Sequence, residues 1–471
     1  MRKKILVTFL ILNSTFLIHN CFGQYTKLFD FAGTSNGSNP YGSLVSDGTF
    51  LYGMTYSGGV NNMGTIFKIM PDGSGYSKLL DFANDTLHGY NPLGTLYYDG
   101  TFLYGMTYSG GTYNNGTVFK IKTDGSGYAK LLEFTPANGG MPFGALISDG
   151  VFLYGMTYFG GTSNLGTIFK IKPDGSGYAE LLDFNDTNGS YPNGSLIYDG
   201  TFLYGVTQGG GVNGVGAIFK IMPDGTGYTK LLDFPSISDA WVPYGSLIYD
   251  GTFLYGATNF GGTGTCPDGC GTIFKLKPDG TGYSKLLDFT GMANGSFPWG
   301  NLISDGVFLY GMTTFGGIND SGVVYKIKPD GTGYSKLLDF SGATNGSTPF
   351  GSLFTIGNFM YGMTNTGGAN NMGTIFKINP IGMGIAANNL KNDFVVFPNP
   401  TNGKFNVAIS QLANFKMKNI EIYNVVGECI HRQIAKSANL QIDLSEVSNG
   451  IYFIQMKSES GVVTHKIIIQ K

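Results

Sequence analysis

Seven Pro-x-Gly segments recur along the chain, and in five of them the middle residue is aromatic. These five candidate ligand-binding residues are Tyr41, Phe143, Tyr244, Trp299 and Phe350, and the other two middle residues are Leu93 and Asn193. Asn-Gly-Ser segments precede several of them, at 36–38, 188–190, 294–296 and 345–347. Aromatic faces beside amide groups suit a sugar or a peptide ligand. The alternative is that these side chains only fill space between neighbouring structural units.

Groups that could catalyse a reaction are few. His88 is the only histidine between residues 24 and 381, and no nucleophile elbow, HExxH motif or Cys/His cluster occurs. Aspartate recurs before glycine in two series, where it is expected to bond its own backbone: Asp47, Asp99, Asp149, Asp250 and Asp305, and Asp72, Asp124, Asp174, Asp224, Asp279 and Asp330. We therefore expect no catalytic residue, no metal and no cofactor.

The candidate residues lie in a tandem repeat that must position them. Leu51-Tyr-Gly-Met-Thr55 returns with small changes about every 50 residues, at Leu103, Leu153, Leu203, Leu254, Leu309 and Met360. Each repeat holds four short β-rich segments, and Asp-Gly turns join the first to the second and the third to the fourth. Four strands in a repeat of this length predict one blade of a β-propeller.

The order of the strands predicts how the ring closes. Tyr25–Phe31 reads as a fourth strand that precedes the first repeat, whereas the seventh repeat stops after its third strand at Ile378. We therefore predict an all-β fold: a seven-bladed propeller closed by the N-terminal strand, followed by a small C-terminal β-sandwich. The longer loops and the Pro-x-Gly connections then share one face, and the middle residues ring the mouth of the channel.

Opposite charges recur on neighbouring strands of the repeat. Lysine stands on the third strand at 68, 120, 170, 220, 275, 326 and 377, and a carboxylate on the fourth at 30, 81, 133, 183, 233, 288 and 339. Adjacent antiparallel strands can place such residues side by side. We expect ladders of paired charges that stabilise each blade.

The repeat, with its pattern LYGMTYxGG…GTIFKIKPDGSGYxKLLDF, resembles the GloVer tandem repeat of exported bacterial proteins. The resemblance covers Gln24 to about Gly382 and implies no established catalytic activity.

The first 23 residues read as a secretory signal peptide. Three basic residues at 2–4 precede a mostly apolar run, and small residues stand before Gln24. Acylation of Cys21 is disfavoured, because Asn20 precedes it. We expect no transmembrane segment elsewhere, and no nucleic-acid partner, because the net charge is −2 and no basic stripe occurs. Export permits a disulfide between Cys266 and Cys270, and leaves Cys429 free.

The tail is a different module. Alternating apolar residues, such as Phe405, Val407 and Ile409, predict a small antiparallel sandwich. We expect a signal peptide at 1–23, the propeller at 24–381, a linker at 382–392 and the tail domain at 393–471.

The tail resembles the type A sorting domain of the type IX secretion system. The matching residues include Pro398, Asn399, Pro400, Gly450, Tyr452 and Lys466. The resemblance implies a partner, the type IX secretion machinery, and export to the surface or the medium. The alternative is an ordinary binding sandwich.

Together these features predict a secreted or surface-bound, non-enzymatic propeller with a glycan or protein ligand on its long-loop face. A polysaccharide-active enzyme would instead need acid, base or metal groups that converge in the channel. A purely architectural surface protein would show no ligand.

Overall fold

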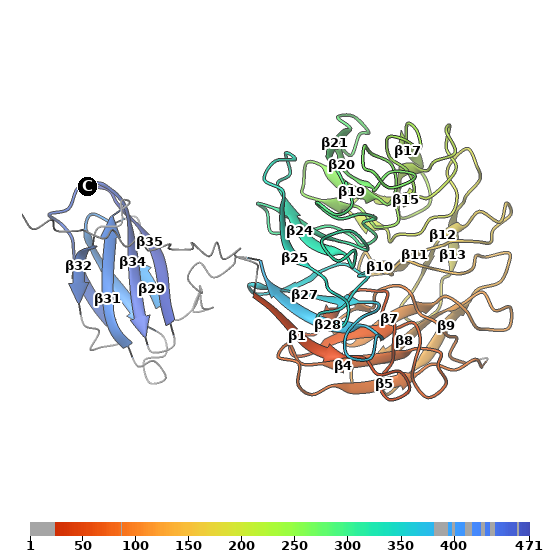
Figure 1. The fold of residues 1–471 in the computed structure, drawn as a ribbon, viewed down its shortest axis with the longest axis horizontal. Coiled ribbons are helices and arrows are strands. Elements are labelled where there is room, and N and C mark those ends of the chain that lie inside the picture. The colour runs from red at the N-terminus through yellow and green to blue at the C-terminus, as the bar shows by residue number, and fades with distance from the viewer. Residues whose placement is uncertain are drawn as a thin grey trace, which may run out of the picture.

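The computed structural model describes residues 24–85, 87–380, 394–397, 401–409, 417–424, 429–433, 439–458 and 461–471. Every regular element in these ranges is a β-strand. Seven four-stranded antiparallel sheets make up the repeat region, and they lie around a common centre (Figure 1). The predicted signal peptide at 1–23 and the predicted linker at 382–392 lie outside the described residues.

The four strands of each sheet follow the four β-rich segments of each repeat. The innermost strands are β2 (Val45–Ser46), β6 (Tyr97–Tyr98), β10 (Ile147–Ser148), β14 (Ile197–Tyr198), β18 (Ile248–Tyr249), β22 (Ile303–Ser304) and β26 (Phe354–Ile356). The second strands are β3 (Leu51–Thr55), β7 (Phe102–Thr107), β11 (Leu153–Thr157), β15 (Leu203–Thr207), β19 (Leu254–Thr258), β23 (Leu309–Thr313) and β27 (Phe359–Thr364).

The third and fourth strands lie farther out in each sheet. The third strands are β4 (Thr65–Ile69), β8 (Thr117–Lys122), β12 (Thr167–Ile171), β16 (Ala217–Ile221), β20 (Thr272–Leu276), β24 (Val323–Ile327) and β28 (Thr374–Asn379). The fourth strands are β5 (Ser77–Asp81), β9 (Ala129–Glu133), β13 (Ala179–Asp183), β17 (Thr229–Asp233), β21 (Ser284–Asp288), β25 (Ser335–Asp339) and, in the last sheet, β1 (Gln24–Asp30).

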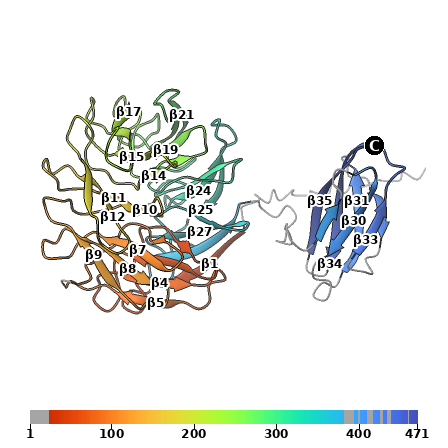
Figure 2. The ribbon, with the colours of Figure 1, turned by 180° about the vertical axis from the view of Figure 1, so that it is seen from behind.

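The N-terminal strand belongs to the last sheet, as its sequence predicted. β1 pairs antiparallel with β28, with Tyr25 opposite Ile378 and Asp30 opposite Thr374. Residues at the two ends of the repeat region therefore share one sheet, and β1 covers the edge that β28 would otherwise expose. Figure 1 shows β1 at the edge of the sheet that holds β28 and β27, and Figure 2 shows β1 and β27 in the same part of the ring from behind.

The hydrophobic core lies between neighbouring sheets rather than within one. One cluster joins Tyr52, Met54 and Ile66 of the first repeat to Leu103 and Phe119 of the second. Equivalent clusters join each later repeat to the next. A seventh cluster packs the last sheet against the first, with Phe31 and Tyr361 against Leu44 and Phe67. Each sheet is thus buried on both of its faces.

The predicted ladders of paired lysine and carboxylate are wrong. The register places Lys68 opposite Ser77 and Asp81 opposite Thr65, so the two charges lie at different ends of the strand pair. Asp81 instead pairs with Lys78 of its own strand at 2.8 Å. Lys68 lies 4.9 Å from the centre of the Phe50 ring, and its ammonium group donates to a carbonyl of the next repeat.

The lysine of the third strand therefore links neighbouring sheets. The same bond to the outer hairpin of the next repeat is made by Lys120, Lys170, Lys220 and Lys275. Cation–π contact and a charged hydrogen bond are both favourable at a half-buried position.

The described part of the C-terminal unit has two sheets. Their strands are β29 (Phe394–Phe397), β30 (Lys404–Ile409), β31 (Met417–Asn424), β32 (Cys429–Gln433), β33 (Asn439–Asp443), β34 (Gly450–Ser458) and β35 (Gly461–Ile469). β29, β30 and β33 form one sheet, and β32, β31, β34 and β35 form the other. Alternate residues of both sheets, such as Phe405, Val407, Ile420, Ile422 and Ile454, share one core, which makes the unit a sandwich.

Candidate functional site

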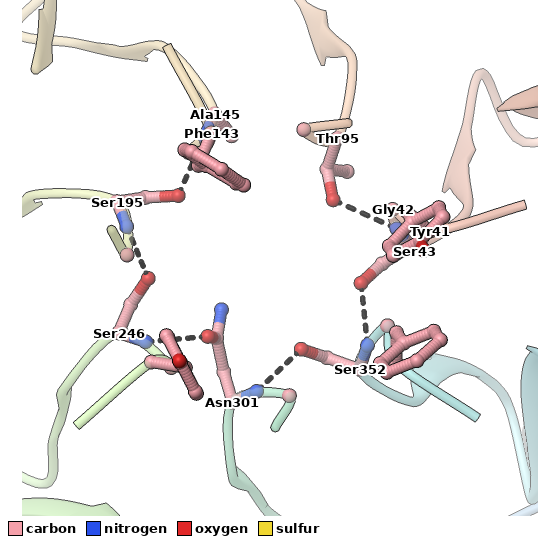
Figure 3. Close-up of a pocket in the computed structure, with 18 of the residues that line it drawn as sticks. Tyr41, Gly42, Ser43, Thr95, Phe143, Ala145, Ser195, Ser246, Asn301 and Ser352 are labelled. Atoms are coloured by element: carbon pink, nitrogen blue, oxygen red, sulfur yellow. Dashed lines mark hydrogen bonds between the residues drawn. The ribbon is translucent and has the colours of Figure 1, made fainter. Parts of the chain in front are cut away.

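The seven Pro-x-Gly segments converge on one pocket. All five predicted aromatic residues, Tyr41, Phe143, Tyr244, Trp299 and Phe350, line it, together with Leu93 and Asn193. The pocket lies where the seven connections into the innermost strands meet (Figure 3). Its volume is about 70 Å³, well below the several hundred Å³ of a site that encloses a whole small molecule.

Glycine allows these segments to approach one another. A Cβ atom on Gly42 would lie 2.2 Å from the carbonyl oxygen of Gly94, and one on Gly351 would lie 2.3 Å from that of Gly42. Each glycine in between also faces the carbonyl of the next: Gly94, Gly144, Gly194, Gly245 and Gly300. Because a side chain would collide with the neighbouring backbone, only glycine fits at these positions.

The residue after each glycine builds a ring of hydrogen bonds around the pocket. The backbone N–H of Ser43 donates to Oγ1 of Thr95 at 2.8 Å, and that of Ser246 donates to Oδ1 of Asn301 at 2.6 Å. Four more such bonds start from Ala145, Ser195, Asn301 and Ser352. The ring has one gap, because Ala145 offers a methyl group to Thr95 where the other six residues offer an oxygen (Figure 3).

The sequence patterns did not predict this ring. Its signal is the position after Pro-x-Gly, which is serine, threonine or asparagine in six of the seven repeats. The predicted amide donors, in contrast, are elsewhere. Asn36, Asn188, Asn294 and Asn345 accept backbone N–H bonds within their own turns, and none of them lines the pocket.

Four of the aromatic side chains form an arc over consecutive repeats. Tyr244 stacks on Trp299 with ring centres 4.0 Å apart, and Tyr41 stacks on Phe350 at 4.7 Å. Trp299 meets Phe350 edge to face at 5.0 Å and joins the two pairs. Phe143 lies outside the arc, between Tyr108 and Tyr158. All five side chains are half-buried, so they both pack between sheets and reach the pocket.

Several polar groups of the aromatic arc and of the pocket lining have no hydrogen-bond partner among the described residues. Burial raises the pKa of Tyr41 and Tyr244, so both phenols stay protonated at neutral pH. Neither phenol, nor the indole N–H of Trp299, has a hydrogen-bond partner in the described ranges. The side chain of Asn193 is also unpartnered there, although the residue is only 6% exposed.

The aspartates of the inner hairpins act locally, as predicted. Oδ1 of Asp47 accepts the N–H groups of Thr49 and Phe50, and Oδ2 accepts the hydroxyl of Tyr52 at 2.7 Å. Burial alone would raise the pKa of this carboxyl, but the three hydrogen bonds outweigh burial and lower it. Asp199, which the sequence analysis missed, makes the same three bonds.

His88 is not part of the pocket. Its Nδ1 lies 2.9 Å from Oδ2 of Asp85, and its ring packs 4.8 Å from that of Tyr128. Over the described ranges, no group of three His, Cys, Asp or Glu side chains could hold a metal.

Cys266 and Cys270 form a disulfide within the loop between β19 and β20. Cys270 is buried against Ile273 and Phe289, and the exposed Cys429 is a free thiol. The disulfide loop lies away from the pocket of the seven connections.

Three of the predicted sorting residues lie on β34 and β35. Gly450 begins β34, Tyr452 is buried and donates from its hydroxyl to the carbonyl of Ser448 at 2.8 Å, and Lys466 pairs with Phe453 across the strands. Pro398, Asn399 and Pro400 lie outside the described residues.

Comparisons with known proteins place both parts of the chain. The Gloeobacter/Verrucomicrobia repeat model matches residues 14–157, 147–266 and 253–403. The secretion system C-terminal sorting domain model matches residues 395–470. No curated protein matches the chain. In the described part of the chain, no helix has the length and apolar character to cross a membrane.

Several solved structures resemble the chain at low identity. PorZ of Porphyromonas gingivalis, a surface component of the type IX secretion system, is 13% identical with a TM-score of 0.45; the match covers 94% of this chain and 61% of PorZ. Oligogalacturonate lyase of Vibrio parahaemolyticus is 11% identical with a TM-score of 0.47, over 76% and 93% of the two chains. A nidogen/laminin complex is 16% identical with a TM-score of 0.41, over 62% and 94%.

The family matches cover most of the chain and agree with its two resemblances. The sorting domain marks a protein that the type IX secretion system carries to the cell surface or the extracellular space. The chain belongs to the Gloeobacter/Verrucomicrobia repeat family and ends in a secretion system C-terminal sorting domain.

Proposed function

We propose that the seven sheets are the blades of a closed β-propeller. Three features support closure: β1 pairs in the last sheet, a hydrophobic cluster joins the last sheet to the first, and glycine contacts run from Gly351 back to Gly42. A closed ring would leave no sheet face unpaired, which suits an exported domain that must resist association with other chains.

On this scaffold we propose a non-enzymatic binding protein, displayed on the surface or released. The observation that carries the proposal is the convergence of one side chain from each of seven repeats on a single pocket, with aromatic rings and unpartnered polar groups at its mouth. A glycan or a protein segment would lie over the arc of Tyr244, Trp299, Phe350 and Tyr41.

The chemistry of the lining supports binding over catalysis. The residues around the pocket include no carboxylate, imidazole, ammonium, guanidinium or thiol. General acid–base or metal-assisted hydrolysis needs such groups within hydrogen-bond reach of the substrate. We further propose that the C-terminal unit contacts the secretion machinery, and that the repeat region is the cargo.

A glycan array with the full chain tests this proposal. Trp299→Ala and Tyr244→Ala should each weaken binding about tenfold or more, because such aromatic anchors dominate binding energy. Tyr113→Ala is the matched control, because Tyr113 is exposed and does not line the pocket.

Thermal melting separates binding from packing. If Trp299→Ala and Tyr244→Ala lose several degrees of melting temperature while binding is unchanged, the arc only fills space between blades. Absence of any glycan or protein ligand would favour a purely architectural protein.

A further inference from the structure

The hydroxyl groups of the pocket ring have protons without acceptors. Each accepts one backbone N–H from the neighbouring repeat, and none donates to an acceptor among the described residues. These hydroxyls belong to Ser43, Thr95, Ser195, Ser246 and Ser352. A hydroxyl whose oxygen already accepts a bond still has one proton to donate.

Amide groups add further donors. Oδ1 of Asn301 accepts the N–H of Ser246, so the two protons of its Nδ2 stay free, and Figure 3 shows this nitrogen directed toward the middle of the ring. Asn193 is nine-tenths buried, lines the pocket and has no hydrogen-bond partner in the described ranges. The N–H of Thr95 donates no ring hydrogen bond among the described residues, because Ala145 has a methyl group at the position that supplies the acceptor elsewhere.

Acceptors are scarce in the same place. The carbonyl oxygen of each of the seven glycines lies against the neighbouring glycine, so close that a Cβ atom there would stand 2.2–2.9 Å from it. The neighbouring backbone thus crowds these oxygens and leaves them poorly accessible to a guest. No anionic side chain lines the pocket. The pocket is therefore matched to a guest that accepts hydrogen bonds, and an anionic oxygen accepts the strongest ones.

The size of the pocket limits the guest. Its volume of about 70 Å³ is far below the several hundred Å³ of a site that encloses a whole small molecule, which favours entry of one small group of a ligand, such as a carboxylate, over a whole sugar ring. The rest of a ligand must then lie at the mouth, where the phenols of Tyr41 and Tyr244 and the indole N–H of Trp299 can bond ring hydroxyls.

A peptide is the weaker fit. Peptides commonly dock by adding a strand to an exposed sheet edge. The strands nearest the pocket are only two or three residues long, from Val45–Ser46 to Phe354–Ile356. They offer too few backbone groups for such an addition.

We propose that the pocket takes the carboxylate of an acidic sugar residue, whose ring rests at the aromatic mouth. This inference rests on the proposed binding function and names its ligand class. The free donors of Asn301, Asn193 and the five hydroxyls bond the carboxylate oxygens.

The test uses the full chain and three matched pairs of disaccharides. The two members of a pair differ only in the terminal residue, which is acidic in one and neutral in the other: glucuronate or glucose, galacturonate or galactose, and mannuronate or mannose. Calorimetry and tryptophan fluorescence report binding, since Trp299 lines the mouth. At least one acidic end should bind about tenfold more tightly than its neutral partner, because charged hydrogen bonds are about twice as strong as neutral ones.

Two variants connect this preference to the pocket. Asn301→Asp keeps an oxygen for the Ser246 N–H but replaces the free donor with negative charge, so the preference for the acidic end should vanish. Asn193→Leu breaks no hydrogen bond of the described residues and should halve the preference or more.

The outcomes separate the two proposals. Equal binding of acidic and neutral ends, or a preference that survives Asn301→Asp, overturns the acidic-sugar assignment and leaves the binding function standing. Failure of all six ends to bind also overturns the acidic-sugar assignment, whereas the binding function is tested separately by the glycan array and by the search for a protein ligand. A tetrapeptide whose free, but not amidated, C-terminus binds in an Asn301-dependent way overturns the choice of a sugar.

Discussion

The backbone N–H of Ser352 donates a 2.7 Å hydrogen bond to Oγ of Ser43, although 309 residues separate them in the chain. The bond joins the innermost connection of the last repeat to that of the first. It repeats the bond that Ser43 makes to Thr95 of the next repeat. The first and last repeats thus share the bond that links five of the six other pairs of neighbouring repeats.

Deleting residues 24–31 should destabilise the repeat region. The deletion removes β1 from β28 and takes Phe31 out of the cluster that joins the last sheet to the first. The exposed edge of β28 should then pair with other chains. We expect a lower melting temperature and larger species in size-exclusion chromatography. A monodisperse monomer with an unchanged melting temperature would contradict this account.

Filling the gap in the pocket ring should stabilise the protein. Ala145→Ser offers an acceptor to the N–H of Thr95, which faces a methyl group now. One added hydrogen bond contributes about 0.5–1.5 kcal/mol, or roughly 1–2 °C in a domain of this size. Ala129→Ser on the outer strand β9 is the control, and it should not move the melting temperature. Equal shifts in both variants would rule out a specific ring bond.

Acid should destabilise the protein as the inner hairpins lose their charge. The pKa values of Asp47, Asp99, Asp149, Asp199 and Asp250 lie below the ordinary 3.8, because hydrogen bonds to each carboxylate outweigh its burial. A depressed pKa in the folded state stabilises above the unfolded value and is lost as pH falls. Melting temperatures should therefore be flat from pH 7 to about 5 and fall below about 4.

Asp149→Asn gives the control for this acid response. Its Oδ1 can still accept the N–H groups of Val151 and Phe152. The variant should melt somewhat below the wild type at pH 7, because Nδ2 of asparagine cannot accept the Tyr154 hydroxyl as Oδ2 does. It should lose less stability in acid, because one titrating carboxylate is gone. An identical acid profile in both proteins would show that the hairpin carboxylates do not cause the loss.

Thiol counting should find one free cysteine in residues 24–471. Cys266 and Cys270 are joined, and Cys429 is free. Mass spectrometry after alkylation under denaturing, non-reducing conditions should show one modified thiol, and three after reduction. So short a loop should add little stability. Three thiols without reduction would contradict the disulfide.

The sequence predicted the sheets because each turn carries its own local signal. Asp47-Gly48 and Asp72-Gly73 mark the hairpins, and the same signals return in the later repeats. The middle residues of Pro-x-Gly were also found, because an aromatic residue between proline and glycine is conspicuous. A fixed repeat length along the sequence therefore predicts which strands are present and in which order they follow one another.

The features that were missed depend on register and on contacts between repeats. Lys68 and Asp81 fall on neighbouring strands, but only the observed register shows that Lys68 faces Ser77. Ser43 looks like any small polar residue after a glycine. Its backbone N–H donates to Thr95 and its hydroxyl accepts the N–H of Ser352. Both partners lie in other repeats, so no local sequence pattern predicts these bonds.

Removing residues 393–471 should leave a folded repeat region that fails to reach the surface. No described sheet contains strands of both units, so the repeats do not need the tail for strand pairing. The tail matches the secretion system C-terminal sorting domain, and such a domain is the signal that directs a protein to this system. Fractionation of the native host should find the full chain at the surface or in the medium, and the truncated chain in the periplasm. The mature form should lack roughly 80 residues at its C-terminus, the size of a small sandwich domain.

Tyr452→Ala, which removes a buried side chain of the tail core, should also reduce export while the repeats stay folded. Export of the truncated chain at the level of the full chain would mean that the tail is a binding module instead.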